Sequence, residues 1–438
     1  MTTDSHDSHS PAPASSSAGA PGSCPFPHAV LGRRAFLRGT ALGAAGTAAL
    51  AVGATAIAHA ADAGPGPSGR QLPFYGPHQS GVLTPPQAEA SFVSFDVTTS
   101  DVEGLRELFQ TLTARIKFLT VGGPPPATDL ASPPTDSDTL GPVIPSDGLT
   151  VTVGVGASLF DARYGLAAFK PEHLVTMPVF PNDNMQDSTE RDGDVSIQFC
   201  ADSRDTVMHA LRDITRHTRA WMQPVWKIDG FHAAPRPAGT TPRNQLGFMD
   251  GIANPDVADP AETNALIWAG GADSVEPAWA AGGSYQVVRI IRMLVEFWDR
   301  VSLQEQETMI GRRRDSGAPL DGTSESDIPD YAADPLGLII PLTAHIRLAN
   351  PRTGATYDQQ ILRRSYNYDR GIDLNGNLDV GLAFCCYQQD VSRQFKTVQT
   401  RLIDEPLVDY IEPTGGGYFY VLPGVKGPGD YFASGLLG

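Results

Sequence analysis

Residues 195–214 read VSIQFCADSRDTVMHALRDI, and residues 380–399 read VGLAFCCYQQDVSRQFKTVQ. Each stretch begins with an apolar run and continues with the spacing of an amphipathic helix. Three pairs of residues correspond when the two are aligned: Val195 with Val380, Phe199 with Phe384, and Cys200 with Cys385. The similarity indicates that one strand-helix unit occurs twice in the chain.

A second kind of strand-helix unit precedes each of these. SFVSFDV (91–97) alternates like a strand, and the next segment (101–119) has helical spacing with Asp101 as a plausible N-cap. Residues 284–311 form its counterpart in the second half. Strand-helix-strand-strand-helix-strand is the order of a ferredoxin-like domain. The sequence therefore predicts an α+β protein with a tandem, duplicated ferredoxin-like fold, in which antiparallel sheets carry peripheral helices.

The N-terminal residues are expected to lie outside this fold. Arg33-Arg34 precede an uncharged run of small apolar residues, and AHA follows at 58–60. This pattern is typical of a twin-arginine (Tat) export signal with a cleavage site. Whether the signal is cleaved stays open. The predicted organisation is a Tat signal peptide (1–60), a Pro/Gly-rich leader extended over the surface (61–90), an N-terminal ferredoxin-like domain (91–245) and a C-terminal one (246–438).

Composition excludes some classes of function. The 438-residue chain has a net charge of −17, whereas a nucleic-acid-binding protein needs a basic surface. Three cysteines remain beyond the signal, namely Cys200, Cys385 and Cys386, and all lie in apolar stretches. They are expected to be buried thiols. The absence of a CxxC pair argues against a zinc or iron–sulfur centre.

One histidine has an unusual setting. His345 ends the apolar run LGLIIPLTA (336–344) and precedes Arg347, Asn350 and Arg352. A neutral imidazole can bind a metal through one nitrogen while the other donates a hydrogen bond, and arginines suit carboxylates. From these residues alone, an axial haem ligand and a buried structural histidine are both open interpretations.

Four motifs occur in a fixed order along the chain: GFMDG (247–251), HIRLANPR (345–352), RRSYNYD (363–369) and GGGYFYVLPG (415–424). Together they resemble the dye-decolourising peroxidase (DyP) family, and in particular its exported, Tat-dependent deferrochelatase/peroxidase branch. The resemblance implies a tandem ferredoxin-like fold with one haem b per chain in the C-terminal half. It also implies a secreted peroxidase that reduces hydrogen peroxide while oxidising dyes or other reductants. The alternative is an iron-uptake protein that releases iron from haem or carries haem.

The resemblance also assigns roles by position. It implies that His345 is the proximal iron ligand, that Asp250 is the distal acid and that Arg363 is the distal arginine. The residues that it places beside the haem are Gly251, Ile252, Ala253, Asn350, Pro351, Arg352 and Arg363. Further candidates are Leu382 and Phe384 for an apolar distal wall, Asp390 for a hydrogen bond with His345, and Arg364 in place of Arg363 if the strand register shifts by one residue.

The chemistry of peroxide gives Asp250 a purpose. One mobile acid can take a proton from one peroxide oxygen and return it to the other, and flanking glycines let the backbone turn tightly around it. The expected partners are hydrogen peroxide, a reductant and the Tat export machinery, with iron-uptake components in the alternative. The expected location is periplasmic, in the cell envelope or extracellular. A homo-oligomer is left open.

Overall fold

The repeated unit is present in the computed structural model, which describes residues 69–271 and 274–438. In the first half, β3 (Val195–Ala201) leads into α2 (Arg204–Thr218). In the second half, β8 (Leu378–Gln388) leads through a turn of π-helix (Ser392–Lys396) into α7 (Thr397–Arg401). The predicted signal peptide (1–60) lies outside the described residues.

The other elements follow the predicted order. The remaining strands are β1 (Glu89–Val97), β2 (Thr150–Gly156), β4 (Met222–Phe231), β5 (Ser284–Met293), β6 (Leu362–Arg363), β7 (Tyr366–Ile372) and β9 (Ile411–Val421). The remaining α-helices are α1 (Val102–Val121), α3 (Pro260–Leu266), α4 (Val295–Trp298), α5 (Leu303–Ile310), α6 (His345–Ala349) and α8 (Ser434–Leu437). Short 3-10 helices cover Ala157–Phe160, Ala167–Phe169, Ala278–Ala280, Gly354–Gln359 and Pro406–Tyr410. The predicted N-cap of α1 is present, because the Asp101 carboxylate accepts a hydrogen bond from the amide of Gly104 at 2.8 Å.

Both halves have the strand order of a ferredoxin-like domain. In the first half the order is β4-β1-β3-β2, and in the second it is β9-β5-β8-β7. Each therefore places its fourth strand beside its first, followed by its third and second. Every strand pair is antiparallel. The α+β class and the tandem ferredoxin-like fold are therefore confirmed.

The sheets of the two halves are continuous. At one junction β2 pairs with β9, from Gly154↔Val421 to Gly156↔Phe419. At the other, β4 pairs with β7 through Phe231↔Asn367. Because β5 also pairs with β8, the strands form one closed ring, with β6 added alongside β8. The sequence predicts antiparallel sheets but not their closure. The edge strands of the two halves pair with each other, which satisfies backbone groups that would otherwise be open.

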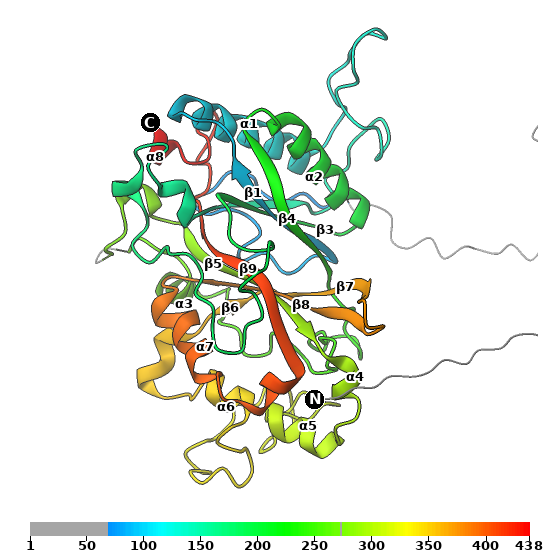
Figure 1. Ribbon diagram of the computed structural model, residues 1–438, viewed down its shortest axis with the longest axis vertical. Helices are drawn as coiled ribbons and strands as arrows, with labels where there is room; N and C mark the ends of the chain where they lie inside the picture. The colour runs from blue at the N-terminus through cyan, green and yellow to red at the C-terminus, as the bar shows by residue number, and fades with distance from the viewer. Residues whose placement is uncertain (1–68, 272–273) are drawn as a thin grey trace, which may run out of the picture. The chain divides into compact units, whose positions relative to one another are not determined.

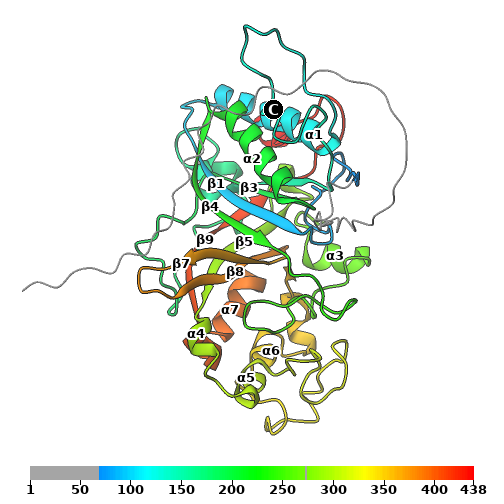
Figure 2. The same ribbon diagram turned by 90° about the vertical axis from the view of Figure 1, so that its right-hand side faces the viewer.

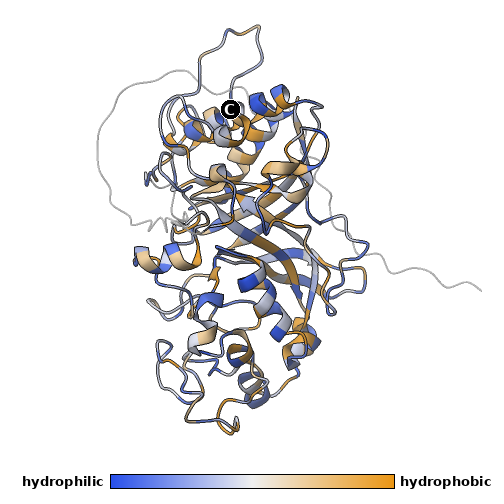
Figure 3. Cartoon of the chain, turned by 90° about the vertical axis from the view of Figure 1, so that its left-hand side faces the viewer, coloured by the Kyte–Doolittle hydropathy of each residue, from blue (hydrophilic) through white to orange (hydrophobic). Residues whose placement is uncertain are grey.

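Different helices cover the first-half strands and the second-half strands of this ring. Helices α1 and α2 lie together over the strands of the first half, whereas α6 and α7 lie over those of the second (Figure 1, Figure 2). Hydrophobic and hydrophilic residues alternate along strands and covering helices (Figure 3). One core cluster lies under α1 and α2 and includes Phe109 and Phe199. A second includes Phe92, Cys200 and Cys385 on the opposite strand faces.

The described part of the leader makes specific contacts with the fold. Residues 69–88 contain no helix or strand, but Gln79 is buried and its side-chain amide donates to the carbonyls of Val153 and Leu422. His78 stacks on Trp268 with ring centroids 3.7 Å apart. Residues 69–88 of the leader therefore pack onto both halves. In the described part of the chain, no helix combines the length and apolarity needed to cross a bilayer.

The junction of β4 with β7 gives a test of the closed sheet. A Cβ at Gly230 would lie 2.6 Å from Cβ of Tyr366, so Gly230→Ala is expected to overpack the junction and lower the free energy of unfolding by about 1–3 kcal/mol. Gly354→Ala is the matched control, because its Cβ would meet nothing within 4 Å. Urea unfolding measures both variants. Equal stabilities of the two would contradict the close approach of β4 and β7.

Candidate active site

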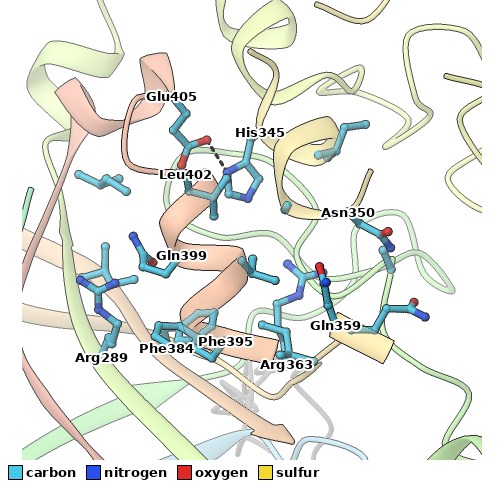
Figure 4. Close-up of a pocket in the computed structure, with 18 of the residues that line it drawn as sticks. Arg289, His345, Asn350, Gln359, Arg363, Phe384, Phe395, Gln399, Leu402 and Glu405 are labelled. Atoms are coloured by element: carbon cyan, nitrogen blue, oxygen red, sulfur yellow. Dashed lines mark hydrogen bonds and ion pairs between the residues drawn. The ribbon is translucent and has the colours of Figure 1, made fainter. Parts of the chain in front are cut away.

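A large cavity lies between the sheet and the helices of the second half. It encloses about 1300 Å³ including its mouth, and its walls come from β5, β8, β9, α6 and α7 (Figure 4). The apolar part of the lining includes Ile291, Phe384, Phe395, Val398 and Leu402. A cavity of this size with mostly apolar walls and a few polar groups suits a large organic ligand.

His345 faces this cavity from the first residue of α6. Its Nδ1 lies 2.7 Å from Oε2 of Glu405, a carboxylate that is 3% exposed. Because a carboxylate accepts, Nδ1–H is the donor and Nε2 is left for a ligand in the cavity. The prediction that Asp390 forms a hydrogen bond with His345 is therefore wrong, because Glu405 takes that position. Its carboxylate instead accepts from the amides of Ser392 and Arg393 and caps the helical turn that follows it.

The protonation of His345 reflects two opposed effects. Burial disfavours the imidazolium, but the charge and hydrogen bond of Glu405 outweigh burial and raise the pKa of His345 above its ordinary 6.5. Arg363 acts to lower this pKa and Asp250 to raise it, which means that both groups lie close enough for their charges to reach the imidazole.

The loop before His345 is anchored by polar contacts. The Asp334 carboxylate accepts from the amides of Leu338, Ile339 and Ile340. Arg347 donates to the carbonyls of Ile340 and Asp334, each at 2.8 Å. These bonds fix the start of α6 and with it the direction of the imidazole.

Asp250 and Arg363 meet, although 113 positions separate them in the chain. Arg363 Nη1 donates to Asp250 Oδ1 at 2.8 Å, and both side chains are largely buried. The side chain of Asn254 holds the backbone of Arg363 in place, since its amide donates to the Arg363 carbonyl at 2.8 Å and accepts from the Arg363 amide at 3.0 Å. Asn254 was not among the predicted site residues.

The turn that carries Asp250 needs its glycines. Gly247 and Gly251 have φ angles of 85° and 110°, which residues with side chains rarely adopt. The preceding Leu246 and Phe248 are buried beside Trp298, whose indole donates to the Leu246 carbonyl at 3.0 Å. The tight turn and its apolar anchor together hold Asp250 against Arg363.

Arg363 and Arg364 are neighbours in sequence, but their side chains point to opposite sides of the strand. Arg363 borders the large cavity, whereas Arg364 points to the other side and is buried between the sheet faces. Arg364 donates to the Thr84 carbonyl at 3.0 Å and lies 3.2 Å from the Cys200 sulfur. Arg364 therefore has a different environment, and the predicted register, with Arg363 beside Asp250, is the observed one.

Two further arginines make the cavity cationic. Arg312 is buried and borders the cavity, and burial followed by the nearby charge of Arg352 lowers its pKa. Nε of Arg352 is buried and has no hydrogen-bond partner among the described residues. A ligand that carries carboxylates would offset the repulsion between these cations. It would also accept a hydrogen bond from the unpaired guanidinium nitrogen. The residues present thus fit a flat apolar ligand with acidic groups and a metal for His345.

The predicted cofactor residues divide into two groups. The cavity is bordered by Ala253, His345, Asn350, Arg352 and Arg363. Ile252 and Pro351 do not border it but are adjacent in sequence to residues that do, and Gly251 borders a second cleft. Phe384 lines the cavity as expected of an apolar wall, whereas Leu382 borders a second cleft beside Asp250. The roles of these residues stay predictions.

Comparisons with known proteins agree with this arrangement. Family models described as Dyp-type peroxidase, N-terminal and C-terminal, match residues 79–232 and 241–426. A deferrochelatase of Escherichia coli (strain K12) is 51% identical over 369 residues, which cover 83% of this chain and 87% of that protein. A deferrochelatase of Yersinia pestis is 50% identical over 399 residues, covering 89% and 92%.

Solved structures show the same similarity. A DyP-type peroxidase from Cellulomonas bogoriensis superposes with a TM-score of 0.75 at 36% identity, covering 85% of this chain and 99% of that one. Ferric DtpA from Streptomyces lividans gives a TM-score of 0.75 at 34% identity, covering 84% and 97%.

The pair of His345 and Glu405 predicts a pH-dependent stability in the cofactor-free chain. A raised pKa in the folded state stabilises the fold fully below the unfolded pKa near 6.5, and this contribution is lost as the pH rises through the folded value. Glu405→Gln should therefore lose more stability relative to the unchanged chain at about pH 6 than at about pH 9.

Urea unfolding at the two pH values measures this difference. In a His345→Ala background, Glu405→Gln should show no such pH dependence, because the titrating partner is absent. A loss that grows toward the higher pH would contradict the assignment.

Proposed function

The chain belongs to the Dyp-type peroxidase family, and from this premise we propose that it is an exported haem b peroxidase with Asp250, Arg363 and His345 as its working residues. The family uses haem, hydrogen peroxide and a reductant. The observation that best supports the proposal is that His345 faces the cavity from one side while Arg363, paired with Asp250, borders it from the other (Figure 4).

Different residues would bind the iron and the propionates of a bound haem. His345 would hold the iron through Nε2, and its bond to Glu405 would strengthen the imidazole as a donor. Arg312 and Arg352 would pair with the propionates, which the unpaired Nε of Arg352 supports. Haem supplies the redox chemistry of peroxide reduction when it is bound.

Asp250 and Arg363 would manage protons and charge. Asp250 would take a proton from one oxygen of peroxide and deliver it to the other. Arg363 would stabilise negative charge on the departing oxygen from a fixed position, because Asn254 holds its backbone. A protein that only carried haem would need neither group, so their contact favours turnover over carriage.

The second candidate function is release of iron from haem. Relatives that are 50–51% identical bear the name deferrochelatase, which favours this candidate. Replacing iron in a porphyrin requires two protons for the nitrogens that held the metal. Asp250 is a carboxylate near the same cavity and could serve either reaction.

The export route also belongs to this proposal. The twin arginines Arg33-Arg34 and the apolar run behind them support export through the Tat machinery, which carries folded proteins. The protein would then act in the periplasm, the cell envelope or outside the cell, on dyes or other reductants and beside iron-uptake components.

The first test concerns the iron ligand. His345→Ala should abolish the Soret absorption of a histidine-ligated haem after reconstitution, because the described residues that line the cavity include no other histidine, cysteine or methionine. Asp390→Asn, which changes an acid away from the imidazole, should leave the spectrum unchanged. An unaltered spectrum in His345→Ala would refute ligation by this residue.

The second test separates the two candidate functions. Arg363→Ala should lower the rate of peroxide reaction by about 10²–10³-fold, the cost of one preorganised charged donor, with haem still bound. Asp250→Asn should lose the same reaction because it cannot accept a proton. Stopped-flow absorption with peroxide measures both. An unchanged peroxide rate in both variants, together with iron release that Asp250→Asn abolishes, would favour the iron-releasing function instead.

A further inference from the structure

A second cleft lies on the far side of Arg363 from His345. It encloses about 680 Å³ including its mouth and is bordered by Asp250 and Arg363 but not by His345. Arg363 borders both spaces, so its side chain stands between the cleft and the large cavity. Asp250 borders only the cleft, which makes the cleft the solvent-side approach to this carboxylate.

His232 lines the same cleft. It directly follows β4, where its amide donates to the Ala88 carbonyl at 2.7 Å. Its ring packs edge-on against fully buried Tyr366, with centroids 5.8 Å apart and an interplanar angle of 68°. Backbone and ring are thus both fixed, which gives the imidazole a set position in the cleft.

The ring nitrogens of His232 are available. In the described part of the chain, no hydrogen bond or ion pair involves them, and neither is among the buried atoms without a partner. They therefore reach the open space of the cleft, where Asp250 is the carboxylate on its wall. An imidazole with both nitrogens accessible can accept a proton at one and release a proton from the other.

Burial and a neighbouring cation favour the neutral form of His232. Burial lowers its pKa first, the nearby charge of Arg364 lowers it further, and Asp250 opposes them to a smaller extent. The other cations of the cleft are already engaged, Arg363 by Asp250 and Arg243 by the carbonyls of Gly247, Arg314 and Asp315. Because its pKa is lowered from the ordinary 6.5, His232 favours the neutral form at neutral pH.

We propose that His232 is a proton relay that connects Asp250 with solvent through the second cleft. A proton from cleft water would bind one ring nitrogen, and the proton on the other nitrogen would pass through water to Asp250 while the external reductant delivers its electrons. Asp250 would pass this proton to the oxygen atom that becomes the second water, so that ring and carboxylate return to their starting charges. Reducing one hydrogen peroxide to two waters consumes two protons and two electrons. The external reductant supplies the electrons, and the relay supplies protons. The inference rests on the proposed function of Asp250.

His232→Phe is the informative variant, because phenylalanine keeps the ring that packs on Tyr366 and lacks both nitrogens. The reconstituted protein should keep its haem spectrum but oxidise its reductant about tenfold more slowly in steady-state turnover with peroxide. This loss is smaller than the ~10²–10⁴-fold effect of a group that transfers the proton directly, because His232 acts through Asp250. Added imidazole should restore part of the rate, which a purely structural defect would not allow. The loss should be largest in weakly buffered solution.

His78→Phe is the matched control. His78 is also a partly buried histidine packed against an aromatic ring, and burial lowers its pKa as well, but it does not border the cleft. This variant should keep the unchanged rate. A rate equal to that of the unchanged protein in His232→Phe, or a loss that imidazole does not repair, would overturn the relay.

A second readout does not depend on turnover. In the full-length cofactor-free chain, NMR of ¹⁵N-labelled histidine should show the pKa of His232 falling further in Asp250→Asn, because Asp250 raises it. No change would show that the two groups do not communicate and would overturn the relay. If Asp250→Asn keeps the peroxide reaction, the proposed function itself fails. If Asp250→Asn loses the reaction while His232→Phe keeps the steady-state turnover rate, the relay alone fails.

Discussion

The antiparallel pairing of β4 with β7 brings together parts of the chain that are far apart in sequence. Phe231 pairs with Asn367, and Gly230 allows Tyr366 to approach where a side chain would prevent it. His232 emerges directly after this contact. Asn367 donates to the Arg243 carbonyl at 2.9 Å and so ties the turn before Asp250 to the same junction. Without this strand pairing between the two halves, Asp250, Arg363 and His232 would not lie around one cleft.

The two halves show how a repeated unit can acquire a ligand cavity. Phe199 and Phe384 hold equivalent places in β3 and β8. In the first half, long α1 and α2 pack directly on the sheet, and Phe199 is completely buried beneath them. In the second half, a π-helical turn and the short α6 and α7 take the place of long helices, and Phe384 borders open space. The cavity therefore occupies the layer that helices fill in the other copy.

The sequence predicted what local pattern and motif order determine. Alternation and helical spacing gave the strands, α1 with its Asp101 cap, and the duplication, while the motifs gave His345, Asp250 and Arg363. It did not give Glu405 or Asn254. Glu405 lies 60 positions after His345, between α7 and a short 3-10 helix, and no local pattern distinguishes it from Asp390. Asn254 acts by hydrogen bonds to a backbone 109 positions away. Such contacts depend on how the closed sheet aligns its halves, which a sequence pattern does not specify. The closure itself was also missed, because edge strands carry no mark of their partners.

The closed ring has a consequence for how the chain matures. Gly154 must find Val421, so the last junction joins a strand near the beginning of the fold to one near its end. Contacts of such large sequence separation form late and slow folding. During synthesis, the edge of β2 stays unpaired until almost the whole polypeptide has left the ribosome. We expect chaperones to shield this edge from other nascent chains.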